Sequence, residues 1–310
     1  MSMALDRRDF LGSTAKGLFA AAAGAALGPV CRGGEKAGST SKKKIVVGAH
    51  PWVYAATQPN YDIYPILDRI FADMSYAGLD GIELMHTALR PPDAVEHIRE
   101  LSKKYALPII GTSFSGDMWD RAQHAAISED AERVVTRLAM LGGWTFGVSV
   151  GKAPQPKTPE QLDTQAELLR GIIALCQGKG IVLNLHNHTY EVENNMHDLK
   201  GTLARIPRVK LGPDLNWLLR GGVDPVKFIE TYGDRIVFLH IRDQKANGKW
   251  SEAVGEGDMD YVAIGKALHA AKFSGDVVIE LAHERDFKLT RPLRESLKMS
   301  RACVKQTLGF

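Results

Sequence analysis

Four segments of this chain carry side chains that commonly bind metal ions, and each segment follows an apolar run. They are Asn184-Leu185-His186-Asn187-His188, Pro213-Asp214-Leu215-Asn216-Trp217, His240-Ile241-Arg242-Asp243 and Val278-Ile279-Glu280-Leu281. A set of imidazoles and carboxylates suits a divalent ion such as manganese, zinc, iron or cobalt. We therefore expect His186, Asp214, His240 and Glu280 to hold one such ion.

Each of these ligands also has a structural alternative. A histidine after an apolar strand can simply be hydrogen-bonded, although two histidines at corresponding places favour a shared role. Asp214 stands where an aspartate often caps the following helix. Asp243 is expected either to cap or to pair with Arg242. Glu280 ends an apolar run, where an unpaired carboxylate would be costly, so a ligand role is favoured.

Four protein ligands would leave such an ion one or two open coordination positions for a substrate that carries a hydroxyl next to a carbonyl. It would polarise the carbonyl and acidify the neighbouring C–H or O–H. Glu280, His188 and Glu83 are the candidate catalytic groups, and Glu191 lies just beyond the fifth apolar run. His50, Trp52, Trp217 and Arg242 are the candidate substrate-binding groups. A tryptophan can stack on a sugar ring, but it can equally serve packing alone.

The elements that must position these groups alternate along the chain from Lys44 onward. Eight strands are predicted, at 45–49, 81–85, 108–112, 146–150, 181–186, 209–213, 236–241 and 276–281, and helical spacing is clear at 63–77, 94–105, 130–141, 159–177 and 225–232. Thr158 and Asp224 are plausible N-caps, each followed by proline. Continuously apolar strands are typical of a parallel sheet covered on both faces. The pattern predicts a single-domain (β/α)₈ TIM barrel over residues 44–310, with the functional groups at the carboxyl ends of its strands.

An open, doubly wound sheet is the alternative fold. It would call for a glycine-rich phosphate-binding turn after the first strand, whereas this chain has Gly48-Ala49-His50-Pro51-Trp52 there. The segment Gly255-Glu256-Gly257-Asp258 has no P-loop lysine, and we interpret it as a turn or flexible lid. The net charge of +3 is dispersed, so no nucleic-acid partner is expected. Three scattered cysteines do not make a disulfide framework.

Residues 1–43 are predicted to be an export signal and linker. Arg7-Arg8-Asp9-Phe10-Leu11 precedes an alanine-rich apolar run, which is the layout of a twin-arginine signal. The run is shorter than the roughly 20 residues that a membrane span needs, so no stable membrane insertion is expected once the signal is removed. Gly28-Pro29-Val30 before Cys31 matches a lipobox poorly, so a lipid anchor is not expected. We predict a periplasmic or other extracytoplasmic location.

The chain from about Lys44 to the C-terminus resembles the xylose isomerase-like family of sugar isomerases and epimerases, most closely from Asn184 to Glu280. Gly233-Asp234-Arg235-Ile236 leading into His240-Ile241-Arg242-Asp243, followed by Gly255-Glu256-Gly257-Asp258, is similar to that family's pattern around the seventh strand. The resemblance implies a (β/α)₈ barrel with one divalent ion, most often manganese. It also implies a sugar substrate on which protons are moved next to a carbonyl.

Two departures from the family pattern bear on the reaction. The family's epimerases have a glutamate at the end of the fifth strand, where this chain has His186. Glu280 is then the remaining carboxylate of a pair that works on opposite faces of the substrate in the epimerases. Elimination or hydration of a keto-sugar is therefore an alternative to two-face epimerisation. Branches with a His-x-His end to this strand resemble inosose dehydratase and keto-glycoside lyases. The second departure is Arg242, where the family often has lysine.

We therefore expect a metal-dependent enzyme that removes a proton α to the carbonyl of an unphosphorylated sugar or keto-sugar, with isomerisation, elimination or hydration to follow. One alternative is a metal-dependent phosphodiesterase of the endonuclease IV type, which would need two or three ions. The other is a barrel that binds sugar without catalysis. The sequence leaves the oligomeric state open.

Overall fold

Eight parallel strands form the core of the protein. The computed structural model describes residues 44–284 and 286–310. The strands are β1 Val47–Ala49, β2 Gly81–Met85, β3 Ile109–Ser115, β4 Thr145–Ser149, β5 Val182–Leu185, β6 Lys210–Leu211, β7 Phe238–Ile241 and β8 Asp276–Ile279. Their hydrogen-bonded order is β6-β5-β4-β3-β2-β1-β8-β7, so sequence neighbours pair and the first strand pairs with the last. This is the strand order of a (β/α)₈ barrel.

The barrel closes between β6 and β7 through a few backbone contacts. The amide of Val237 donates to the carbonyl of Leu211 at 2.9 Å, and the amide of His240 donates to the carbonyl of Pro213 at 3.0 Å. Because β6 is only two residues long, this seam is the sparsest junction of the sheet. The β6 and β7 ends that carry Asp214 and His240 therefore lie next to each other.

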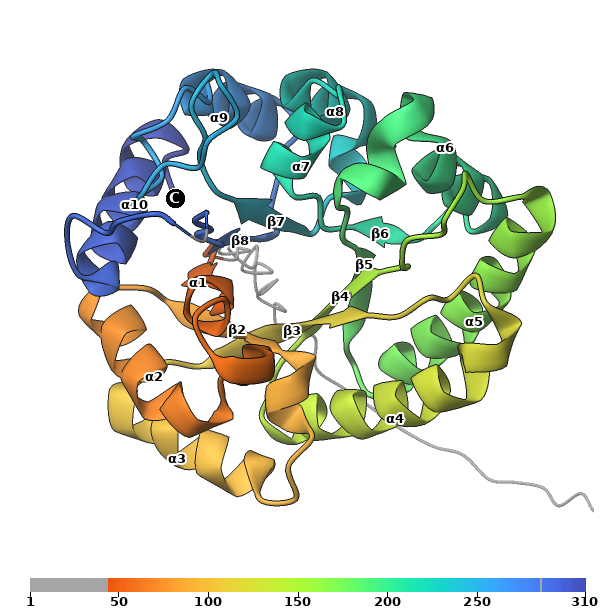
Figure 1. Ribbon diagram of the computed structural model, residues 1–310, viewed down its shortest axis with the longest axis horizontal. Coiled ribbons are helices and arrows are strands. Elements are labelled where there is room, and N and C mark those ends of the chain that lie inside the picture. Colours follow the sequence, from red (N-terminus) through yellow and green to blue (C-terminus); the bar gives the residue numbers. More distant parts are fainter. Residues whose placement is uncertain (1–43, 285) are drawn as a thin grey trace, which may run out of the picture. The chain divides into compact units, whose positions relative to one another are not determined.

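An outer ring of helices covers the strands (Figure 1). The helices are α1 Trp52–Ala55, α2 Leu67–Tyr76, α3 Ala94–Tyr105, α4 His124–Met140, α5 Pro159–Gly178, α6 Thr189–Arg205, α7 Leu215–Arg220, α8 Pro225–Tyr232, α9 Tyr261–Ala270 and α10 Leu293–Thr307. Short 3₁₀ turns occupy Pro59–Tyr61, Tyr64–Ile66, His86–Leu89, Arg121–Gln123 and Gly233–Arg235. Thr158 forms a capping box with Gln161, and Asp224 accepts from the amides of Val226 and Lys227, so both predicted N-caps are confirmed.

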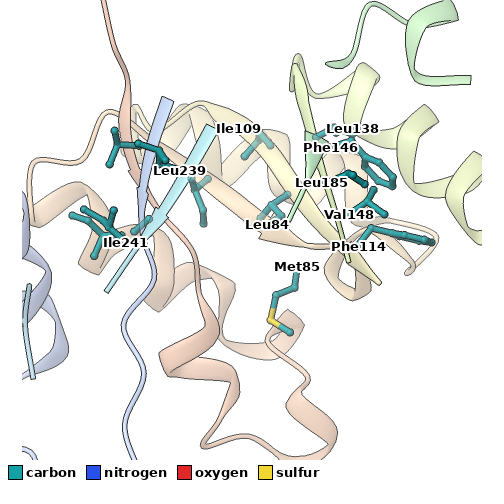
Figure 2. Close-up of a cluster of buried hydrophobic side chains, with 14 of the residues drawn as sticks. Leu84, Met85, Ile109, Phe114, Leu138, Phe146, Val148, Leu185, Leu239 and Ile241 are labelled. Carbon is teal, nitrogen blue, oxygen red and sulfur yellow. The ribbon is translucent and has the colours of Figure 1, made fainter. Parts of the chain in front are cut away.

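Two apolar layers hold the barrel together. The larger one lies between strands and helices, and Figure 2 shows members of it such as Leu84, Phe146 and Leu239. A smaller cluster, built on Ile110, Phe238 and Val278, is separate from it and fills the inside of the barrel. Gly48 and Gly81 make room for Ile110, because a Cβ on them would lie 2.8 and 2.4 Å from its side chain. Side chains alternate along a strand, so His240 and Glu280, two residues beyond Phe238 and Val278, also point inward.

Several predicted boundaries differ from the structure for local reasons. β3 runs on to Ser115, three residues past the predicted end, which adds Ser113 to the mouth of the barrel. β6 is shorter than predicted because it is followed by Gly212 and by Pro213, which has no amide hydrogen to donate. α4 begins at His124, before the first large apolar residue of its stripe. The helix predicted from residue 63 starts as a 3₁₀ turn containing Pro65.

The predicted export signal and Cys31 lie outside the described residues. Among residues 44–284 and 286–310, no helix has the length and apolar character needed to cross a bilayer.

Candidate active site

Three of the four predicted metal ligands converge at the carboxyl ends of β5, β6 and β7. Ligand atoms of His186, Asp214 and His240 all lie within 4.8 Å of one another. Asp214 and His240 are buried. Nδ1 of His186 is also buried and has no hydrogen-bond partner among the described residues. An orphaned imidazole nitrogen beside a carboxylate and a second imidazole is what an ion would satisfy.

Glu280, the fourth predicted ligand, lies at the edge of this group. Its Oε2 is 3.0 Å from Nδ1 of His240 and 2.8 Å from Nη2 of Arg242. The same guanidinium nitrogen is 2.6 Å from Oδ2 of Asp214. Burial alone would raise the pKa of Glu280, but Arg242, His50 and His240 outweigh it and hold that pKa well below its usual range. Arg242, predicted to bind substrate, therefore lies buried between two candidate ligands as their counter-charge.

Glu83 at β2 reaches across the barrel to His240. Its Oε2 is hydrogen-bonded to Nε2 of His240, and both side chains are buried. Burial would lower the pKa of His240, but the carboxylates of Glu83 and Glu280 raise it to about 10. A carboxylate on the far nitrogen of an imidazole is the usual partner of a metal-binding histidine. Nδ1 of His240 is then the nitrogen that faces the ligand group.

Asp214 caps a helix as well as joining the ligand group. Its Oδ1 accepts from the amides of Asn216 and Trp217 at the start of α7, at 2.9 and 3.0 Å. Its Oδ2 is the oxygen that faces Arg242. The two alternatives for this residue are thus compatible, because each uses a different oxygen.

A pocket of about 150 Å³ opens beside the ligand group. Its lining residues are His50, Trp52, Met85, His86, Ser113, Phe114, Ser115, Gly147, Ser149, His186, His188, His240 and Glu280. Among the predicted substrate-binding residues, His50 and Trp52 line it, whereas Trp217 and Arg242 do not. Trp217 instead lies between Arg242 and His188, with its ring 5.3 Å from the guanidinium carbon and 5.9 Å from the imidazole.

His50 is fixed in one tautomer by two neighbours. Its Nδ1 accepts from the amide of Trp52 at 3.2 Å, which leaves Nε2 to donate to the Ser113 hydroxyl at 2.9 Å. Burial lowers the pKa of His50, which keeps the ring neutral. Ser113 had no signal in the sequence, because the predicted third strand stopped before it.

His188 lines the same pocket, and hydrogen-bonding groups of neighbouring residues fix its position. Its Nδ1 lies 3.1 Å from the Tyr190 hydroxyl and 3.3 Å from the Ser149 hydroxyl. Ser149 in turn donates to Oε1 of Glu191 at 2.6 Å, and the other oxygen of Glu191 accepts from the His188 amide at 2.7 Å. Burial lowers the pKa of His188 to about 4, so its ring is neutral. Ser149 and Tyr190 were not predicted as site residues.

The sequence of this barrel matches one protein family. Residues 71–303 match the model described as a xylose isomerase-like TIM barrel, which covers more than half of the chain. The chain belongs to the xylose isomerase-like TIM barrel family.

Relatives of this xylose isomerase-like barrel are diverse. An inosose dehydratase from Geobacillus kaustophilus is 27% identical over 165 residues, which cover 46% of this chain and 53% of the dehydratase. The match thus spans about half the length of that relative. D-allulose 3-epimerase from Methylomonas sp. has a TM-score of 0.72 at 19% identity, over 86% of this chain and 99% of the epimerase. A 3-keto-D-glucoside 4-epimerase from E. coli has a TM-score of 0.66 at 19% identity, over 84% and 100%. At these identities the solved structures show the shared fold.

The residues of this xylose isomerase-like barrel suit a divalent ion. Two imidazoles and one or two carboxylates give a mixed nitrogen and oxygen donor set. His186 offers an unpartnered buried nitrogen, and His240 has its outer nitrogen already held by Glu83. His186, Asp214 and His240 would hold the ion, with Glu280 as the adjoining carboxylate.

Proposed function

We propose that the protein is a metal-dependent enzyme that removes the proton α to the carbonyl of an unphosphorylated sugar or keto-sugar. The observation that carries this proposal is the position of His188. Its imidazole lines the pocket beside the ligand group but is not needed as a ligand, so a base and an electrophilic centre share one cavity. Manganese is the favoured ion by resemblance, with zinc, iron or cobalt as alternatives.

A bound divalent ion would polarise the substrate carbonyl and stabilise the enediolate that forms when the α proton leaves. Proton removal itself falls to the protein. The contacts of Glu280 with Arg242 and His240 are already made, so this carboxylate is engaged. His188 borders the pocket and is not needed as a ligand, so its position makes it the better candidate for the base. Glu83 acts through His240 as a positioning residue.

The pocket favours elimination or isomerisation over two-face epimerisation. Glu280 is the only carboxylate among its lining residues within the described part of the chain. A pair of carboxylates on opposite faces of a substrate is therefore not available here. The similarity to an inosose dehydratase supports the same preference. His50, Ser113 and Trp52 would contact the substrate's hydroxyls and ring.

A phosphodiesterase of the endonuclease IV type is the less favoured candidate. That activity would need two or three ions, whereas one group of three ligands is found in residues 44–284 and 286–310. The dispersed charge of +3 offers no basic groove for a nucleic acid.

The test combines metal analysis with isotope exchange. Wild-type protein and the variants His240→Ala and His269→Ala are compared after purification in the presence of manganese. His269 is the matched control, because its ring binds the carbonyl of Leu308 away from the pocket. We expect about one ion per chain in the wild type and the control, and its loss in His240→Ala.

The same proteins are then incubated with a panel of keto-sugars in D₂O. Wild type should place deuterium α to the carbonyl of at least one sugar, and His240→Ala should not. Two or three ions per chain would favour the phosphodiesterase. One ion with sugar binding but no exchange would point to a non-catalytic barrel.

A further inference from the structure

A row of three residues crosses one wall of the pocket, with one residue from each of β3, β4 and β5. Ser113 pairs with Gly147, and Gly147 pairs with Asn184, in parallel register. Because paired residues on neighbouring strands face the same side of a sheet, all three face the side on which Ser113 borders the pocket. Gly147 borders the pocket too, but it has no side chain to fill the space in front of it. The wall is therefore open at β4, beside Asn184.

Asn184 carries a buried carboxamide without a partner. The residue is 0% exposed, and neither Oδ1 nor Nδ2 has a hydrogen-bond partner among the described residues. Buried polar groups in this state cost free energy, so they normally find a partner. Oδ1 would lie 3.6 Å from a Cβ on Gly147 and 1.9 Å from a Cβ on Gly212. Glycines on β4 and just after β6 thus flank the carboxamide, and the glycine on β4 borders the pocket.

Glu83 brings a second polar side chain to the same place. Its Oε2 is bonded to Nε2 of His240, whereas its Oε1 would lie 3.5 Å from a Cβ on Gly147. The carbonyl oxygen of Thr112 follows at 3.9 Å, so the three heavy atoms nearest to this point are all oxygens. A carboxyl oxygen accepts hydrogen bonds, and a carboxamide both donates and accepts them. A group that enters here from the pocket must therefore be small and polar.

We propose that Gly147, Asn184 and Glu83 form a subsite for one hydroxyl group of the sugar, and that Gly147 determines the specificity for this hydroxyl. This inference rests on the proposed function for its ligand. The hydroxyl donates to Oε1 of Glu83 and accepts from the carboxamide of Asn184. A hydroxyl suits both partners, because it has one donor and two acceptor positions. An ionised phosphate would place an acceptor against a carboxyl oxygen, so the subsite also favours an unphosphorylated sugar.

Gly147→Ala tests the subsite with a small change. The added methyl group would lie between 3.5 and 3.9 Å from its neighbours, which is ordinary contact, and φ of Gly147 is not positive, so this variant should fold. The methyl group would block the approach to Asn184 and Glu83. Gly171→Ala is the matched control, because a Cβ at this position of α5 would meet no neighbouring atom of the described residues within 4 Å. Asn184→Leu removes the carboxamide and keeps its branched shape.

The first readout is thermal unfolding of chelator-treated protein without sugar. Asn184→Leu should unfold at a temperature no lower than the wild type, because the carboxamide has no hydrogen bond to lose. Asn187→Leu is the control. Asn187 is also buried, but its carboxamide bonds to the backbone of Asp214 at 3.2 and 3.3 Å, so this variant should unfold earlier. If Asn184→Leu unfolds as early as Asn187→Leu, the carboxamide of Asn184 has a structural partner such as a buried water, and the subsite is overturned.

The second readout is calorimetric binding of the D-ketohexoses and their monodeoxy analogues to manganese-loaded protein. At one hydroxyl position, the wild type and Gly171→Ala should bind the deoxy analogue about 10- to 100-fold more weakly than the parent sugar. In Gly147→Ala and Asn184→Leu this difference should shrink to about threefold or less, because the hydroxyl loses its partners. A difference that persists in Gly147→Ala would overturn the subsite, and so would a wild type that binds every deoxy analogue as tightly as its parent.

Deuterium exchange with the same sugars separates the subsite from the proposed function. Exchange by a wild type that makes no distinction among the deoxy analogues would support the proposed function and reject the subsite. A distinction that is lost in Gly147→Ala, without exchange of any sugar proton, would support the subsite in a non-catalytic barrel. A wild type that neither binds these sugars nor exchanges their protons would reject both.

Discussion

Arg242 is the residue on which the charge balance of the site depends. One of its nitrogens touches both Asp214 and Glu280, and all three side chains are buried. Burial would lower the pKa of Arg242, but the two carboxylates outweigh it and keep the guanidinium charged. A divalent ion bound at this place would supply a second positive charge to the same carboxylates. The stability of the metal-free protein should therefore depend on Arg242 more than that of the metal-loaded protein.

Arg242→Met should destabilise the metal-free protein by about 3 kcal/mol, because two buried carboxylates lose their cation. Adding manganese should recover much of this loss. The measurement is urea unfolding with chelator and with excess manganese. Lys157→Met serves as control, since Lys157 pairs with Asp198 in a separate buried cluster. Lys157→Met should lose the same amount of unfolding free energy with and without manganese. If manganese changes the stability of both variants equally, Arg242 does not balance the charge of the ion site.

At the scale of elements, the loop between β7 and α9 is organised by one carboxylate. Asp243 accepts from the amides of Gln244, Gly255, Gly257 and Met259, at distances between 2.8 and 3.2 Å. A Cβ on Gly257 would lie 2.0 Å from Oδ1 of Asp243, so the close approach requires glycine. These hydrogen bonds fix the turn around Gly255 to Asp243. Asp243 takes neither of the two roles expected for it, because Asp260 is the N-cap of α9 and the ion pairs of Arg242 are with Asp214 and Glu280.

Asp243→Ala should therefore cost about 3 kcal/mol of unfolding free energy, because four amides, three of them in part-buried hydrogen bonds, lose a charged acceptor. Asp260→Ala, which removes an ordinary N-cap from α9, should cost about 1 kcal/mol. Limited proteolysis should cleave the loop faster in Asp243→Ala only. Equal stability and equal cleavage of the two variants would show that the loop is held by other contacts.

At the scale of the whole barrel, closure depends on the seam between β6 and β7. The two candidate ligands Asp214 and His240 lie on opposite sides of this seam and are themselves bridged as neighbours in the sheet. An ion held by both would link the two strands more firmly than the sparse backbone bonds do. Metal binding should thus stabilise the point at which the barrel is weakest.

Hydrogen exchange followed by mass spectrometry tests this expectation. Without ion, peptides covering 209–214 and 236–241 should exchange faster than those covering β3 and β4, which share five paired positions. Manganese should slow exchange at the seam by about tenfold or more, and His240→Ala should lose that protection. If the seam exchanges as slowly as β3 and β4, or if manganese has no effect there, the ion does not join the two strands.

The fold and the candidate ligands could be predicted from the sequence because both follow from short-range patterns. Apolar runs marked the eight strands, and three- and four-residue spacing marked α3 and α8 at their observed limits. Parallel strands in a barrel bring their carboxyl ends to one face. Residues just beyond each run, such as His186, Asp214 and His240, could therefore be grouped without coordinates, and the structure brings these three together.

The pairings within the site were decided by the tertiary structure alone. Glu83 and His240 are 157 residues apart, and Ser149 and Glu191 are 42 apart, so no spacing links either pair. Which inward side chain meets which depends on the stagger of the strands and on the space left around the inner cluster. Ser113 and Tyr190 follow the same rule, since a lone hydroxyl in a chain has no periodicity. Local sequence determines which groups reach the mouth of the barrel, whereas the packing of distant strands decides which of them form hydrogen bonds or ion pairs with each other.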